Sequence, residues 1–217
     1  MKVRLIQYAI YTVLPFIGIV FLGWDWRGVL ILYWLENITV GVGTIINIFS
    51  APNESADLKT PDSEPSVKIN DKSLALKGAA AKLFYAGFFM IHYGMFTFVH
   101  GIFVALIVSG VIWGGELGWP DIRMAFVAWI LGSLLQLAWL IQERRNPAIS
   151  RPTAAQSFTQ PYGRIIALHL AIIFGVILIV ALKLPSAAAL LLIAIHTTMD
   201  VVSYVRWRKK QATKSML

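Results

Sequence analysis

Ionisable residues occur inside stretches of this chain that are otherwise strongly apolar. They are Glu36, His92, His100, His196 and Asp200. A charge in the hydrocarbon of a bilayer is costly, so an ionisable residue in such a stretch is a functional-site candidate by default. Imidazole and carboxylate groups support metal coordination and proton transfer. The types of these residues therefore indicate a candidate site inside a membrane.

A set of histidine and carboxylate ligands without cysteine favours Zn, Fe, Mn, Cu or Ni over Ca or Mg, because imidazole prefers transition metals. The chain has no cysteine, so any bound metal must use nitrogen and oxygen ligands. We predict a transition-metal site with the ligands Glu36, His92, His100, His196 and Asp200. A bound metal would activate water as a nucleophile near neutral pH. Glu36 or Asp200 would then be the catalytic general base.

Counting along helices places these residues at two depths. At a rise of about 1.5 Å per residue, Glu36 and His100 lie about 13 Å from the outer ends of their spans, and His196 lies about 16 Å from its own. By the same count, His92 and Asp200 form a second level nearer the cytoplasmic side. His196 and Asp200 are spaced i,i+4, so they share one helical face. We expect helices from different parts of the chain to bring these side chains together.

The composition is that of an integral membrane protein. Of 217 residues, 58% are hydrophobic and only 14% are charged, whereas soluble domains have about 25% charged residues. The mean hydropathy is +0.69. Apolar windows near the length of about 20 residues that crosses a bilayer lie at 5–22, 29–49, 83–108, 124–141, 165–182 and 187–205. The pattern predicts an all-α polytopic bundle of six transmembrane helices, because lipid cannot satisfy free backbone polar groups.

Lysine and arginine set the expected topology. The net charge of +8 is concentrated before the first window, in alternate loops and after the last window, which predicts that both termini are cytoplasmic. We predict one membrane domain, 1–217, with a flexible cytoplasmic loop at 51–81 and a basic cytoplasmic tail at 206–217. A basic face with exposed aromatic residues, which nucleic-acid binding needs, is not indicated. Membrane lipids are the expected partners, and no nucleic acid is expected.

Two segments resemble a bacterial family of multi-span membrane proteins of unknown function. They are LYWLEN at 32–37 and the segment 91–103, which contains HYG at 92–94 and HG at 100–101. The resemblance implies a multi-pass location in the bacterial cytoplasmic (inner) membrane. It marks Glu36, Asn37, His92, Tyr93 and His100 as motif positions, but it implies no activity, cofactor or partner. Ceramidase-like intramembrane zinc hydrolases share only chemical similarity, because their ordered motifs do not map onto this chain.

Four functions are open at this point. The first is metal-dependent hydrolytic or redox chemistry on an apolar or lipid substrate. The second is a proton- or ion-coupled transporter or channel that uses the same residues as a relay. The third is an accessory subunit of a homo-oligomer or membrane complex, in which these residues only form hydrogen bonds between helices. The fourth is the binding of haem b by paired histidines.

Overall fold

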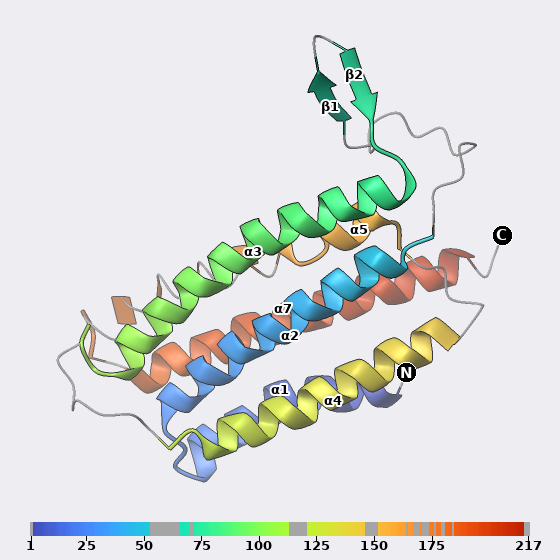
Figure 1. Ribbon diagram of the computed structural model, residues 1–217. Helices are drawn as coiled ribbons and strands as arrows, with labels where there is room; N and C mark the ends of the chain where they lie inside the picture. Colours follow the sequence, from blue (N-terminus) through green and yellow to red (C-terminus); the bar gives the residue numbers. More distant parts are fainter. Residues whose placement is uncertain are drawn as a thin grey trace.

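The structure is a computed structural model that describes residues 2–52, 66–69, 72–112, 121–145, 152–163, 165–166, 170, 174–175, 177–178, 181–183 and 185–214. Its long helices run side by side in an elongated bundle (Figure 1). They are α1 (Lys2–Phe21), α2 (Trp26–Ser50), α3 (Gly78–Val108), α4 (Arg123–Arg145) and α7 (Pro185–Lys214). A short helix, α5 (Ala154–Thr159), lies beside α3 near one end.

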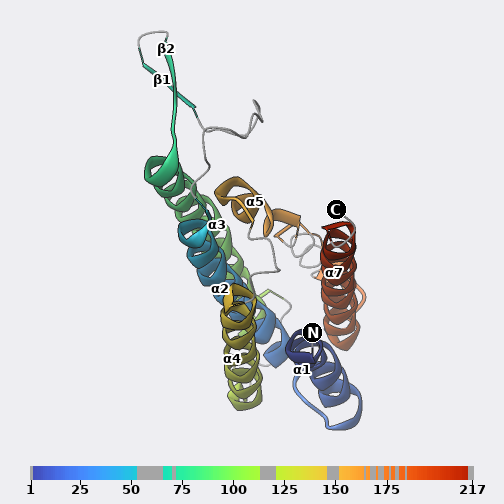
Figure 2. The same ribbon diagram turned by 90° about the vertical axis from the view of Figure 1, so that its right-hand side faces the viewer.

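Helix α2 is the centre of the bundle. It contacts α3, α4, α5 and α7, while α1 packs against α4 and α7. Figure 2 shows this arrangement from the end, with α3 and α7 on different sides of α2. A polar side chain on α2 can therefore meet partners from either side.

Close contacts between helices depend on small residues. A Cβ atom on Gly101 of α3 would lie 2.9 Å from the indole ring of Trp34 on α2, so only glycine permits this approach. Trp34 fixes the contact further, because its Nε1–H donates to the carbonyl of Thr97 at 2.9 Å. A side chain on Gly132 of α4 would likewise collide with the ring of Tyr11 on α1.

Among the described residues, three helices are long and apolar enough to cross a membrane: α2, α3 and α4. Shorter apolar helical stretches lie at Ile10–Phe21 in α1 and Ala189–Val202 in α7. Large apolar side chains cover the outside of α3, where Ile91 is 75% and Phe98 is 69% exposed. An apolar exterior of this kind suits lipid, and the helices indicate a membrane protein.

The sequence-based windows coincide with α1, α2, α3, α4 and α7, while the window at 165–182 falls where the chain is described only in part. Both termini lie at the same end of the bundle as the α2–α3 connection (Figures 1 and 2). An even number of spans would give this arrangement. Six membrane crossings and cytoplasmic termini stay predictions.

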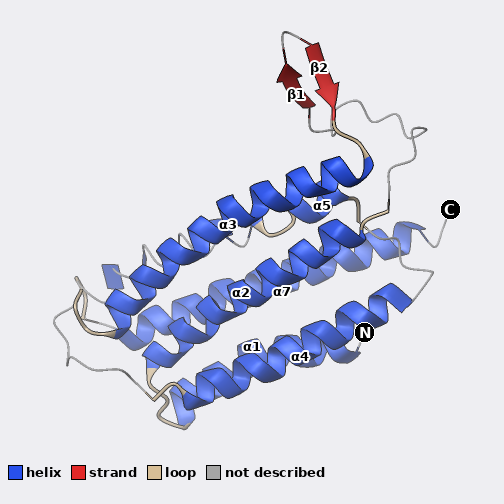
Figure 3. Ribbon diagram, in the orientation of Figure 1, coloured by secondary structure: helices blue, strands red, loops and turns tan. Residues whose placement is uncertain are grey.

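The connection between α2 and α3 contains a hairpin that we did not predict from the sequence. Strands β1 (Ser66–Ile69) and β2 (Lys72–Ala75) pair antiparallel, with Ser66 opposite Ala75 and Ile69 opposite Lys72. The hairpin projects from the end of the helical bundle (Figure 3). The segment 51–81 that contains the hairpin is rich in Ser, Pro, Asp and Lys, and we found no apolar periodicity there from which to predict a strand. The predicted flexibility of this loop remains untested.

Candidate functional site

The interior of the bundle is polar at a few positions. Most large exposed side chains are apolar, whereas the buried polar or charged residues include Glu36, Asn37, His100, His196 and Asp200, each at most 8% exposed. This inverted pattern is expected when a bundle faces lipid and turns its ionisable groups inward. The buried polar side chains therefore define the candidate site.

Glu36 on α2 and His196 on α7 are in direct contact. Glu36 Oε2 lies 2.6 Å from His196 Nε2, although 160 positions separate the residues in the chain. Both side chains are almost fully buried, at 3% and 2% exposure. Such a short distance is typical of a hydrogen bond in which at least one partner is ionised. The contact joins the central helix to the last helix of the bundle.

Asp200 is the second carboxylate beside His196. Asp200 Oδ2 lies 3.4 Å from His196 Nδ1, one helical turn further along α7. This separation is an ion-pair distance, longer than an optimal N–H···O hydrogen bond. The imidazole thus has a carboxylate near each of its two nitrogens. We call Glu36, His196 and Asp200 the α2–α7 cluster.

Aromatic side chains hold the imidazole in place. The ring of Tyr33 stacks on His196 with centroids 4.3 Å apart and planes inclined by 15°. The Tyr33 hydroxyl donates a 2.7 Å hydrogen bond to the carbonyl of Tyr11 on α1. Tyr11 itself lies against the histidine, with ring centroids 6.2 Å apart. Sequence reasoning gave these tyrosines no positioning role, although Tyr33 precedes Glu36 by three residues and so shares its helical face.

His100 has a different environment from the α2–α7 cluster. Its Nδ1 lies 2.7 Å from the carbonyl of Phe96 in the preceding turn of α3. It lines a small cavity together with Asn37. Our prediction put His100 at the same depth as Glu36 and His196, but depth along a helix does not determine which way a side chain points. The structure pairs Glu36 with His196 and places His100 beside Asn37.

His92 lies in an aromatic cluster between α3 and the segment after α5. Its ring is 5.5 Å from that of Phe88, 5.0 Å from that of Phe96 and 5.6 Å from that of Tyr162. The predicted second level, which puts His92 at the depth of Asp200, stays a prediction. His169, the remaining histidine of the chain, lies outside the described residues.

The predicted metal site is not supported by the described part of the chain. No group of three or more His, Asp or Glu side chains there has an arrangement that could hold a metal ion. His92 lies among aromatic rings, and His100 Nδ1 lies beside the backbone carbonyl of Phe96. Glu36, His196 and Asp200 remain together as a cluster of ionisable side chains.

A comparison with known protein families finds a match over almost the whole chain. The family of unknown function DUF6498 matches residues 2–217. The chain belongs to this family. No curated protein and no solved structure matches it. DUF6498 membership agrees with the resemblance to a family of unknown function, and it assigns no activity. The motif positions and the bacterial origin stay predictions.

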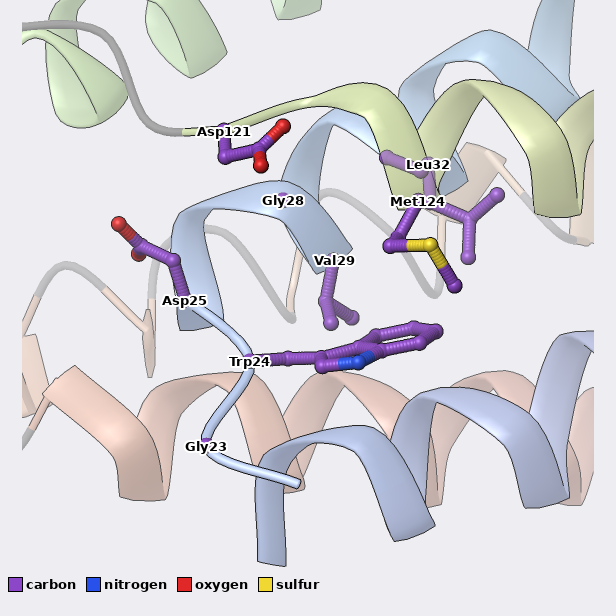
Figure 4. A pocket seen from close by; sticks show the side chains of 9 residues that line it. Gly23, Trp24, Asp25, Gly28, Val29, Leu32, Asp121 and Met124 are labelled. Carbon is purple, nitrogen blue, oxygen red and sulfur yellow. The ribbon is translucent and has the colours of Figure 1, made fainter.

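The DUF6498 chain also has a larger pocket at the end of the bundle where α2 and α4 begin. Its volume is about 310 Å³, and Figure 4 shows the Trp24 ring beneath Val29 and Met124 on one side of it. Leu32 lines this pocket and precedes Glu36 by one helical turn. The pocket therefore ends close to the α2–α7 cluster along the axis of α2. We did not predict it, because it forms between segments distant in the sequence.

Paired charges flank this pocket. Asp25 and Asp121 each precede a helix and accept a hydrogen bond from the backbone N–H of Arg27 and Arg123, at 2.9 and 3.0 Å. Each arginine side chain returns to the same carboxylate, with closest distances of 2.6 Å. The side-chain and backbone hydrogen bonds from Arg123 lower the pKa of Asp121 to about 2. The mouth of the pocket is therefore polar but charge-balanced.

Proposed function

We propose that this chain is a multi-pass protein of the bacterial cytoplasmic membrane whose α2–α7 cluster binds and transfers protons, as the core of a proton-coupled transporter or proton relay. The observation that carries the proposal is the position of the His196 ring. One nitrogen lies 2.6 Å from Glu36 and the other 3.4 Å from Asp200. An imidazole can take up a proton at one nitrogen and release one from the other.

The geometry favours a proton over a metal ion as the species that the cluster binds. A ring nitrogen that donates to a carboxylate has no lone pair to give to a metal. A proton placed on this cluster is instead shared by strongly coupled groups, which titrate together rather than separately. Such groups buried in a membrane protein commonly form proton relays.

The cluster also extends along the axis of the bundle. Helices α2 and α7 run in the same direction, from the end with the pocket to the end with the termini (Figure 1). Leu32 at the pocket precedes Glu36 by one turn, and Asp200 follows His196 by one turn, each step being about 6 Å along a helix. Transfer from Glu36 through His196 to Asp200 would move a proton toward the end with the termini. This path follows the axis of the bundle, along which a proton must move to cross the membrane.

The proposal is tested by proton flux into liposomes. Purified protein is reconstituted in vesicles that contain a pH-sensitive dye, and a potassium diffusion potential drives proton entry. We expect faster acidification than in protein-free vesicles, and a return to the protein-free rate in Glu36→Gln and His196→Asn. His92→Phe is the matched control, because it removes a histidine that lies in an aromatic cluster outside the α2–α7 cluster. A wild-type rate equal to that of empty vesicles would contradict the proposal.

A further inference from the structure

Asn37 presents an unsatisfied polar atom to the interior. The residue is 8% exposed, and its side-chain oxygen Oδ1 has no hydrogen-bond partner among the described residues. A buried acceptor without a donor destabilises the folded protein. The backbone beside it is well satisfied, because the hydroxyl of Tyr93 on α3 donates to the Asn37 carbonyl at 2.9 Å. The side chain therefore requires a donor of its own.

A small cavity lies at this position between α2 and α3. Its volume is about 10 Å³, and it is lined by Asn37, Tyr93, Phe96, Thr97, His100 and Ile165. A cavity needs about 10–15 Å³ and a few polar partners to hold one water molecule. The volume is too small for a larger ligand. Turning the Asn37 amide around would not remove the requirement, because its NH₂ group also needs a partner when buried.

His100 supplies a second polar group to the cavity. Its Nδ1 lies 2.7 Å from the Phe96 carbonyl, and a carbonyl oxygen can only accept, so Nδ1 carries the hydrogen. In the neutral ring Nε2 is then an acceptor, and in the protonated ring it is a donor. A water molecule can serve both forms, since it can donate or accept. The hydroxyl oxygen of Tyr93, whose hydrogen is used on Asn37, offers a further acceptor.

We infer that this cavity is a binding site for a single water molecule, which donates to Asn37 Oδ1 and is shared with the imidazole of His100. The bound water satisfies the buried amide and gives His100 an exchangeable proton partner on the α3 side of α2. Glu36 and Asn37 are consecutive, so α2 connects the α2–α7 cluster on one side with this hydrated histidine on the other. Any part that His100 plays in proton transfer rests on the proposed function, but the water site itself does not.

Water-edited solid-state NMR of the full chain in lipid bilayers tests the site. The experiment measures how fast magnetisation from water reaches the side-chain carbonyl of Asn37 and the ring of His100. Thr44 is the matched control, because it is similarly buried on the same helix at 7% exposure and its hydroxyl is bonded to Val40 O at 2.9 Å. We expect at least twofold faster transfer to Asn37 than to Thr44. Equal rates would overturn the inference.

Asn37→Leu provides a second test, in which a hydrated cavity and a dry cavity predict opposite changes of the thermal midpoint. The change keeps a branched side chain and removes the amide. If the site holds water, the variant loses the fast transfer at His100 and its thermal midpoint falls. A midpoint above that of the wild type would overturn the inference, because removal of an orphan polar atom from a dry cavity is stabilising. Neither readout uses proton flux, so failure here and failure of the proposed function are distinguishable.

Discussion

The contact between Glu36 and His196 should have a measurable coupling energy that exceeds that of a neutral hydrogen bond in a membrane. The 2.6 Å distance and the nearly complete burial of both side chains indicate a hydrogen bond with an ionised partner, which contributes about 1.5–3 kcal/mol. Neutral hydrogen bonds between membrane helices average only about 0.6 kcal/mol. The two values are far enough apart to be distinguished.

A double-mutant cycle with Glu36→Met and His196→Phe measures this coupling. Methionine keeps the length of the side chain, and phenylalanine keeps a ring to stack on Tyr33. Each single variant leaves one polar partner buried, whereas the double variant leaves an apolar pair, which costs less than the sum of the single changes. We expect a coupling energy of at least about 1.5 kcal/mol.

Reversible unfolding in mixed detergent micelles supplies the free energies of unfolding. A second double-mutant cycle, on a pair that also includes a residue of α2, is the control. The hydroxyls of Thr39 on α2 and Ser133 on α4 lie 2.9 Å apart and form a neutral hydrogen bond. Thr39→Ala and Ser133→Ala should give a coupling near 0.6 kcal/mol, roughly the membrane average. A Glu36–His196 coupling no larger than this control would contradict the assignment of an ionised partner to this contact.

Further predictions concern packing and the polar mouth of the pocket. Tyr33→Phe should lower the free energy of unfolding by about 1 kcal/mol, because the hydrogen bond is lost. Tyr33→Leu should lower it by a further amount of about 0.5–1.5 kcal/mol, because the stacking is lost as well. Equal unfolding free energies for the two variants would argue against stacking. Gly101→Ala should destabilise by about 1–3 kcal/mol because its Cβ would press on an indole ring. Gly94→Ala should not lower the thermal midpoint, because apart from its chain neighbours and its own helix backbone no described atom lies within 4 Å of the added carbon. The pKa of Asp121 is lowered to about 2, so its contribution to stability is complete above about pH 4 and is lost as the pH falls through 2; an NMR titration should show this midpoint, and Arg123→Met should move it toward the ordinary value of about 3.9.

Helix positions and one part of the site could be predicted from the sequence. The length of the apolar windows located the long helices, because a membrane crossing demands a nearly fixed number of residues. The i,i+4 spacing placed His196 beside Asp200 on one face, and the structure has them 3.4 Å apart. Counting depth also put Glu36 and His196 at similar levels, and the structure has them in contact. Periodicity and rise per residue were sufficient for these features.

The partners of His92 and His100 could not be predicted in the same way. Depth along a helix leaves open which neighbour packs against each face, and that depends on contacts between distant segments. Glycine at position 101 lets Trp34 of α2 approach α3, and His100 lines a cavity together with Asn37. His92 instead meets the aromatic ring of Tyr162, which follows α5. The cavity and the pocket depend on the same packing and so have no signal in the sequence.

Infrared difference spectroscopy of the reconstituted protein is the most direct test of the claim that the α2–α7 cluster binds and transfers protons. Spectra are recorded at two pH values between which the liposomes show proton flux. We expect a change in a carboxyl C=O band that disappears in Glu36→Gln and shifts in His196→Asn, because these side chains share the proton. Difference spectra that are identical in the wild type and in both variants would contradict it.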